Sequence, residues 1–265
     1  MKTKLMTMCA VVGMILAVSG VAQATIFEND YSDAAQASNY GIDRANPGGF
    51  TVNDNDDGVL NISVLSADAA GQTSSFYNFH GLSTSPVGDL GAPRGATVTV
   101  DLYVPSSWDG DSTKRAGDLW VRIDDPAQTP GNDYYPTIGI YNYADGQGAM
   151  VSMFSASAGG FDGDTGTNDP FYDRYDIPII FDGWNQLGIR YTSTGVDYLF
   201  NSQVVGTDND PGYLATLNLD AVLLQGWQGE VDYTATFDNL VVTPEPATLC
   251  LLGLGGLLLF RKRRA

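Results

Sequence analysis

Apolar and polar residues alternate along much of the middle of the chain. In residues 60–64 and 97–104 every second residue is aliphatic, and the residues between them are mostly polar. A period of two is typical of a strand with one buried and one exposed face, whereas the spacing of an amphipathic helix is rare here. Further strands are predicted at 119–123, 137–143, 150–155, 186–192, 196–200, 219–225 and 231–242. The pattern predicts an all-β protein with about ten strands.

Short connections rich in Gly, Asn, Asp and Pro separate these strands, as expected of tight turns. Residues 184–205 form the clearest unit, because two short turns, at 192–195 and at Asn201-Ser202, divide them into three strands. Many short antiparallel strands favour a sandwich of two sheets. Since no Pro/Ser-rich linker interrupts residues 25–243, we expect a single β-sandwich domain there.

The first 24 residues have the layout of a signal peptide. Lys2 and Lys4 precede an apolar run at 8–18, and small residues at Ala22 and Ala24 follow it. The run is shorter than the roughly 20 residues of a spanning helix, which argues against a permanent anchor. We expect export through the Sec translocon and cleavage by signal peptidase after Ala24.

The last 22 residues combine three different segments. They begin with Pro244, Glu245 and Pro246, continue with an apolar run at 247–260, and end in a basic cluster. The cluster comprises Arg261, Lys262, Arg263 and Arg264. The prolines favour an extended, exposed stretch, the apolar run is expected to enter the inner membrane as a transmembrane helix, and the basic residues stay cytoplasmic.

Charge is distributed very unevenly. All 31 acidic residues lie between positions 25 and 246, together with only seven basic residues, so this region carries −24 while the whole chain carries −18. Such a surface repels phosphate backbones, and nucleic-acid binding is therefore excluded. The two cysteines, Cys9 and Cys250, lie in the apolar ends, which excludes thiol chemistry and thiolate-bound zinc from the middle of the chain.

The C-terminal pattern, residues 244–265, resembles the PEP-CTERM sorting signal. That resemblance implies recognition by exosortase, a membrane protease-transpeptidase, of the Pro-Glu-Pro motif, the short helix and the basic tail. It also implies a transient inner-membrane anchor, removal of the helix near residues 244–246, and a mature protein on the cell surface or in the extracellular matrix of a Gram-negative-type bacterium.

The middle of the chain resembles the concanavalin A-like, or laminin G-like, jelly roll. The resemblance rests on residues 57–62, on the hairpins of 184–205, and on a closing strand at 233–242 that contains Asp238-Asn239. It implies an antiparallel β-sandwich. A sandwich of the carbohydrate-binding-module type or an immunoglobulin-like sandwich remains the alternative.

No known catalytic pattern is complete in the sequence. Enzymes of the concanavalin A-like fold that cut β-glucans carry a Glu-x-Asp-x-(x)-Glu strand with two catalytic glutamates. The nearest match begins at Glu230 and Asp232, but Thr234 and Ala235 stand where the second glutamate should be. His80 is the only histidine and could act as the base of a Ser-His-Asp site, but the sequence has no Gly-x-Ser-x-Gly motif to supply the serine nucleophile. We therefore expect that the protein is not an enzyme.

Two kinds of binding site are compatible with the composition. Acidic loops suit calcium, which takes carboxylate and carbonyl oxygens, so a structural calcium is the one cofactor considered. Solvated turns on an acidic protein are the simpler explanation of the same residues. Exposed aromatic side chains could stack on sugar rings, although core packing explains most aromatics. The calcium candidates are Asp54, Asp56, Asp57, Asp162 and Asp164, and the glycan candidates are Trp108, Tyr134, Tyr135, Trp184 and Trp227.

Three functions fit these observations. The first is an exported, exosortase-processed surface or matrix protein that binds extracellular polysaccharide. The second is a secreted polysaccharide hydrolase that uses aspartates, and the third is a purely structural envelope protein. Reducing-end release from polysaccharide separates the second from the other two.

Overall fold

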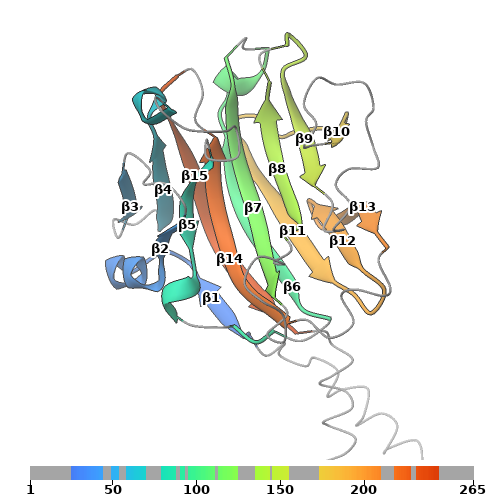
Figure 1. Ribbon diagram of the computed structural model, residues 1–265. Helices are drawn as coiled ribbons and strands as arrows, with labels where there is room; N and C mark the ends of the chain where they lie inside the picture. Colours follow the sequence, from blue (N-terminus) through green and yellow to red (C-terminus); the bar gives the residue numbers. More distant parts are fainter. Residues whose placement is uncertain are drawn as a thin grey trace, which may run out of the picture.

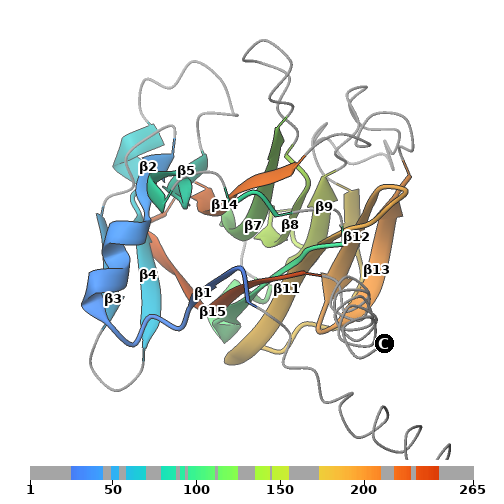
Figure 2. The same ribbon diagram turned by 90° about the horizontal axis from the view of Figure 1, so that it is seen from below.

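The chain folds into two facing antiparallel sheets (Figures 1 and 2). The computed structural model describes residues 25–43, 49–53, 58–69, 79–87, 90–92, 95–110, 113–124, 135–143, 145–154, 173–209, 218–227 and 231–244. Every strand pairing among these residues is antiparallel. The predicted fold class, an all-β antiparallel jelly-roll sandwich, is confirmed.

Sheet A and sheet B each consist of strands that are far apart in the sequence. Sheet A has the order β13 (Gln203–Asp208), β12 (Val196–Phe200), β11 (Gly183–Tyr191), β6 (Thr97–Val104), β15 (Tyr233–Thr243), β4 (Val59–Val64) and β3 (Gly49–Asn53), and β1 (Phe27–Asn29) also pairs with β15. Sheet B has the order β10 (Asp173–Tyr175), β9 (Ala149–Phe154), β8 (Thr137–Asn142), β7 (Arg115–Asp124), β14 (Asn218–Trp227), β5 (Phe79–Ser83) and β2 (Gly41–Asp43). Four short 3₁₀ segments among the described residues are η1 (Ala34–Asn39), η2 (Ser66–Ala69), η4 (Ser85–Val87) and η5 (Ser106–Trp108).

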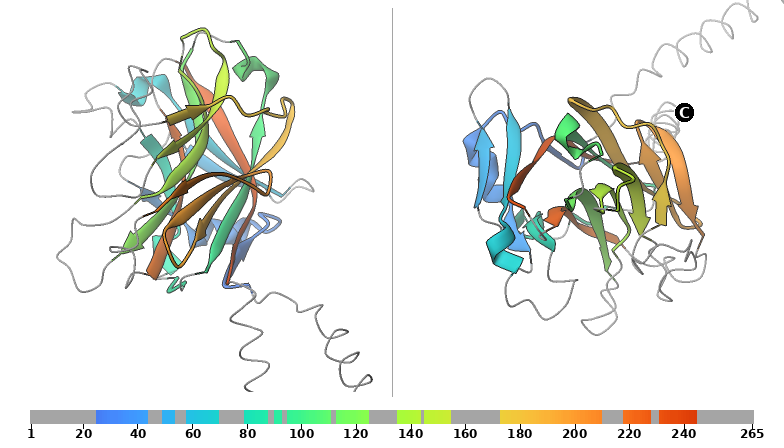
Figure 3. Two further views of the ribbon diagram at one scale, coloured as in Figure 1. Left: turned by 90° about the vertical axis from the view of Figure 1, so that its right-hand side faces the viewer. Right: turned by 90° about the horizontal axis from the view of Figure 1, so that it is seen from above.

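The core lies between the sheets and follows the alternation of the sequence. In β6 every second residue, from Val98 to Val104, is fully buried, while the residues between them are only partly buried. In β7, Leu119, Val121 and Ile123 face the same core from the other sheet. Burying one such side chain contributes roughly 1.5–3 kcal/mol, so the strand pattern and the packing support each other. Figure 3 shows the two layers from two further directions.

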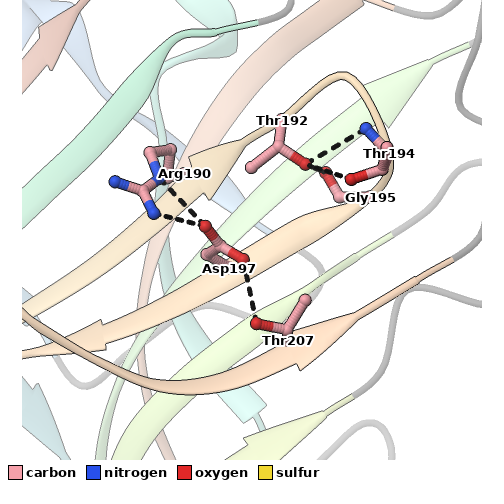
Figure 4. A network of polar contacts seen from close by, with 6 residues as sticks. All are labelled: Arg190, Thr192, Thr194, Gly195, Asp197 and Thr207. Atoms are coloured by element: carbon pink, nitrogen blue, oxygen red, sulfur yellow. Dashed lines mark hydrogen bonds and ion pairs between the residues drawn. The ribbon is translucent and has the colours of Figure 1, made fainter.

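The double hairpin predicted at 184–205 is confirmed as β11, β12 and β13. In the first turn the Thr192 hydroxyl donates to the Gly195 carbonyl at 3.1 Å and accepts from the Thr194 amide at 3.2 Å (Figure 4). In the second turn Asn201 and Ser202 both have positive φ, 48° and 65°. Two such residues make the primed turn that matches the twist of paired strands.

A cross-strand ion pair joins the same hairpins on the outer face of sheet A. Arg190 donates to one carboxylate oxygen of Asp197, and Thr207 donates to the other at 2.9 Å (Figure 4). The three residues lie opposite one another on β11, β12 and β13. They add a side-chain link across three strands to the register that backbone pairing and the buried residues of β12 also hold.

The end of β15 lies beside the beginning of the described chain. β4 pairs with residues 233–237 of β15, and β1 pairs with residues 240–242 along the same side. Among the described residues no helix is long and apolar enough to cross a bilayer. The predicted signal peptide, 1–24, and the predicted transmembrane helix, 247–260, lie outside those residues.

Candidate functional site

The outer face of sheet B carries an unusual set of side chains. β7 supplies Asp118, Trp120 and Arg122 to this face, because their neighbours Leu119, Val121 and Ile123 point into the core. In most sandwiches an outer face is polar and exposed. Here Asp118 is 0% exposed and Trp120 only 4%, so a carboxylate and an indole are buried outside the main core.

Asp118 is held in place by its neighbours on β8. The Tyr141 hydroxyl donates to one carboxylate oxygen at 2.5 Å. The other oxygen lies over Gly139, where a Cβ would come within 2.0 Å of it. Gly139 is the residue directly opposite Asp118 in the register of β7 and β8. A glycine at this position therefore leaves the space that the carboxylate occupies.

The row of residues level with Asp118 continues across the sheet on the same face. Gln225 of β14 lies opposite Asp118, Gly81 of β5 lies opposite Gln225, and Asp43 of β2 lies opposite Gly81. The Gln225 amide donates to the Asp43 carboxylate at 3.0 Å. Asp118 and Asp43 are three strand spacings apart, about 14 Å between backbone positions. The two carboxylates thus line one polar row without touching each other.

Aromatic rings lie on both sides of this polar row. Trp120 packs edge-on against Tyr135, with 6.2 Å between ring centroids, and Tyr141 stacks on Tyr143 at 5.3 Å. The Lys114 ammonium lies 5.0 Å from the centroid of the Trp227 ring. Beyond Trp120, Arg122 forms an ion pair with Asp220 of β14. A carboxylate between aromatic rings and paired charges is a combination that suits a sugar chain.

Tyr233 of sheet A packs against the main core and bonds to the backbone of sheet B at one end of this face. Its hydroxyl accepts from the amides of Ala116 and Trp227, at 3.1 and 2.7 Å, and has their carbonyl oxygens within 2.9 Å as acceptors for its own proton. The backbone pairing of β7 with β14 ends at Gly117 and Gly226, the residues next to Ala116 and Trp227. Burial raises the pKa of Tyr233 above its ordinary value, which keeps the phenol protonated.

The predicted glycan residues occupy different environments. Trp108 lies in the main core, where it is 2% exposed and packs edge-on against Tyr233. Tyr135 and Trp227 flank the outer face of sheet B as partly buried side chains. Trp184 lies on the outer face of sheet A, 39% exposed, with its centroid 5.5 Å from that of Tyr103. Tyr134 lies outside the described residues.

The calcium candidates cannot be placed in this way. Asp54, Asp56, Asp57, Asp162 and Asp164 all lie outside the described residues, as do Ala22, Ala24, Glu245, Pro246 and the basic cluster 261–264. Of the sorting residues only Pro244 is described, half-buried at the end of β15. Within the described part of the chain no group of three or more acidic, histidine or cysteine side chains is arranged to hold a metal ion.

The described part of the partial glucanase motif belongs to sheet A, whereas the candidate site lies on sheet B. Asp232 directly precedes β15 of sheet A, which begins at Tyr233. The Asp232 carboxylate accepts from the amide and the hydroxyl of Ser66, both at 2.8 Å. These bonds, led by the amide, hold the pKa of Asp232 below its ordinary value. His80 is buried on the core side of β5, opposite Gly226. Neither group reaches the outer face of sheet B.

Asp118, Tyr141 and Gln225 were not singled out from the sequence. A faint signal was present, because Asp118 stands at an outward position of a run that is otherwise apolar or glycine, Ala116 to Val121. The decisive observation is the register, which brings Asp118 opposite Gly139 and Gln225.

Comparison with known proteins identifies one motif and one fold. Residues 242–264 match the PEP-CTERM protein-sorting motif, which marks an exported protein that exosortase processes after membrane anchoring. No curated protein matches the chain in sequence. Laminarinase from Flavobacterium sp. UMI-01 has a similar structure, with a TM-score of 0.56 and 12% identity over 83% of this chain and 100% of that chain. The catalytic domain of an endo-1,3-β-glucanase (laminarinase) from Thermotoga petrophila RKU-1 gives 0.55 and 10% over 84% and 98%.

These similarities correct one expectation from the sequence. The expectation that the protein is not an enzyme is overturned, because its fold is shared by these two glucanases. The expectation depended on the absence of a second glutamate from residues 230–235. Residues 233–235 of that segment lie in β15 of sheet A, whereas Asp118 lies in β7 of sheet B. The chain carries a PEP-CTERM sorting motif on a jelly-roll sandwich of the kind found in laminarinases.

Proposed function

We propose that this chain is an exosortase-processed surface protein that hydrolyses an extracellular polysaccharide on the outer face of sheet B. The observation that carries the proposal is the Asp118 carboxylate, which Tyr141 and Gly139 hold in the middle of that face. The glucanase fold supports a β-1,3-glucan as the first substrate to test. The sorting motif supports delivery to the cell surface, where such polymers are found.

The chemistry follows from the charge of the Asp118 carboxylate. Hydrolysis of a glycosidic bond adds water across it and passes through a state in which the sugar carbon becomes positive. The Asp118 carboxylate accepts a hydrogen bond from Tyr141, which stabilises it as an anion. Because Asp118 is 0% exposed, the side chains covering it must move aside when the polymer binds, so that the carboxylate then lies beside that carbon. Tyr143 and Trp227, which are only partly buried, provide ring surfaces on the same face, on which sugar rings can stack.

The test is release of reducing ends from soluble β-1,3-glucan by the mature protein. Asp118→Asn is expected to lower the rate at least about 100-fold, because an amide cannot supply the negative charge. Asp197→Asn is the matched control, since Asp197 is also a hydrogen-bonded carboxylate in mid-strand but lies on sheet A. Circular dichroism verifies that both variants are folded.

Tyr141→Phe keeps the ring and removes only the donor to Asp118, so it provides a second variant that is expected to fold. We expect it to lower the rate about tenfold. A wild-type protein that releases no reducing ends from β-1,3-glucan or from other neutral glucans contradicts hydrolysis. Equal rates for wild type and Asp118→Asn contradict the role of Asp118.

A second activity, polysaccharide binding without cleavage, is favoured by the outer face of sheet A. Trp184 and Tyr103 lie opposite each other, and Thr236, Asn61 and Thr51 continue their row across β15, β4 and β3. Five adjacent strands span about 19 Å, a flat strip of aromatic, hydroxyl and amide groups. Trp184→Ala is expected to reduce retardation on polysaccharide gels without changing hydrolysis.

A further inference from the structure

The sorting motif begins inside sheet A. Its match starts at residue 242, yet β15 continues to Thr243. Residues 241–243 pair with residues 97–99 of β6 on one side, and residues 240–242 pair with β1 on the other (Figure 1). The amide of Ile26 also donates to the carbonyl of Val242 at 2.8 Å. The first residues of the motif are therefore held between two strands.

Little chain separates this sheet from the apolar run of the sorting signal. Thr243 and Ala247 are four residues apart, a distance of at most about 14 Å even when fully extended. Two packed sheets are themselves about 10 Å apart before their outer side chains are counted. An enzyme that works at the membrane and needs residues 244–246 in extended form must fit beside the folded domain or displace part of it.

The structure contains a natural point at which the end of β15 can detach. The pairing of β15 with β6 is interrupted by a bulge between Asp238 and Val241, and Asn239 there has a positive φ of 50°. Asp238 also lies directly opposite Asp101 at the bulge, and the Asn239 side-chain amide donates to both carboxylates, at 3.1 and 3.0 Å. The two like charges are therefore held together by this one amide. Separation of residues 240–243 would expose Leu240 and Val242, which are buried in the core, but would leave residues 233–237 paired with β4.

β1 opposes this separation together with the core, in which Leu240 and Val242 are fully buried. β1 has only three paired residues, of which Phe27 is packed against the core and Glu28 is exposed. We infer that exosortase reaches its motif only when the end of β15 leaves the sheet, and that β1 sets how often this happens. This inference rests on the proposed sorting of the chain by exosortase.

A disulfide between β1 and β15 provides the test. Glu28 and Val241 are opposite each other with partly or fully exposed side chains, and such pairs have Cβ atoms close enough for a disulfide. The exported compartment is oxidising, so E28C/V241C is expected to cross-link there. T51C/N61C, which joins β3 to β4 at an equivalent outward pair, is the matched control. Both are made in a Cys250→Ala background, which itself must be processed normally.

The full chain is expressed in a bacterium that has exosortase, and loss of the tail is followed by intact mass over time. We expect the E28C/V241C cross-link to slow processing at least about tenfold, T51C/N61C to leave it unchanged, and dithiothreitol to restore the rate. Phe27→Ala, which weakens the packing of β1, is expected to accelerate it several-fold.

Three results would overturn the inference. The first is processing of cross-linked E28C/V241C at the rate of the Cys250→Ala parent, and the second is equal slowing by both cross-links. The third is a parent chain that keeps its tail whether or not exosortase is present. That third result also removes the proposed sorting, whereas the first two leave it intact.

Discussion

Replacing Gly139 by alanine is the sharpest test of how the candidate site is built. The added Cβ would lie 2.0 Å from a carboxylate oxygen of Asp118, 2.8 Å from the Gly117 carbonyl oxygen and 2.9 Å from a ring carbon of Tyr141. None of these contacts is tolerable, so the carboxylate must rotate away. The 2.5 Å hydrogen bond from Tyr141 would then be lost, and the backbone around Gly117 must also shift slightly to accept the new Cβ.

The expected cost can be worked out from these contacts. A lost hydrogen bond to a buried carboxylate costs roughly 1.5–3 kcal/mol. Forcing an extra methyl group into a packed site costs roughly 1–3 kcal/mol. We therefore expect Gly139→Ala to lower the free energy of unfolding by about 3–5 kcal/mol.

Urea denaturation of the mature protein, followed by circular dichroism, measures this loss. In an Asp118→Ala background the closest contact disappears, so Gly139→Ala should cost about 2 kcal/mol less there. Gly206→Ala is the matched control, because the close contacts of the new Cβ in strand β13, at 2.9 Å, are with the flexible end of Met153, and its contact with the Tyr198 ring at 3.6 Å is an ordinary one. The same cost for Gly139→Ala in both backgrounds would refute the reasoning.

Two further predictions concern other parts of the sandwich. Tyr233→Phe is expected to lower the free energy of unfolding by about 2–4 kcal/mol in urea denaturation, because the buried amides of Ala116 and Trp227 lose their acceptor. Burial, and then the charge of Asp101, raise the pKa of Asp238, so its ionised form destabilises the fold. Asp238→Asn should therefore stabilise the protein at pH 7 by less than about 1 kcal/mol, and this gain should vanish near pH 3, where the wild-type carboxyl is protonated both folded and unfolded. A gain that grows as the pH falls, or an unchanged stability in Tyr233→Phe, would contradict these accounts.

The alternating pattern was sufficient to predict the long strands. All nine strand segments predicted from it correspond to strands, because one face of each is buried against the other sheet. Strands such as β1, β2 and β10 were not predicted. Each has only three residues, too few to show a period of two, and each pairs with a partner distant in the sequence.

The candidate site could not be predicted for a different reason. Asp118 is one of 28 aspartates, and its place in the otherwise apolar or glycine run 116–121 is only a faint signal. Its position depends on the register of β7 with β8 and β14, which the hydrophobic pattern of the whole sheet determines. The sequence instead drew attention to Glu230 and Asp232, because local motifs can be compared without knowing which sheet a segment joins. The sorting motif was predictable because it is read as a linear segment.

The central claim is that the outer face of sheet B acts on polysaccharide at Asp118. A crystal structure of the mature Asp118→Asn variant with a β-1,3-glucan oligosaccharide tests it most directly. The account predicts a sugar ring within hydrogen-bond distance of residue 118, with neighbouring rings against Tyr143 or Trp227. A sugar bound only elsewhere, together with full hydrolysis by this variant, would contradict it.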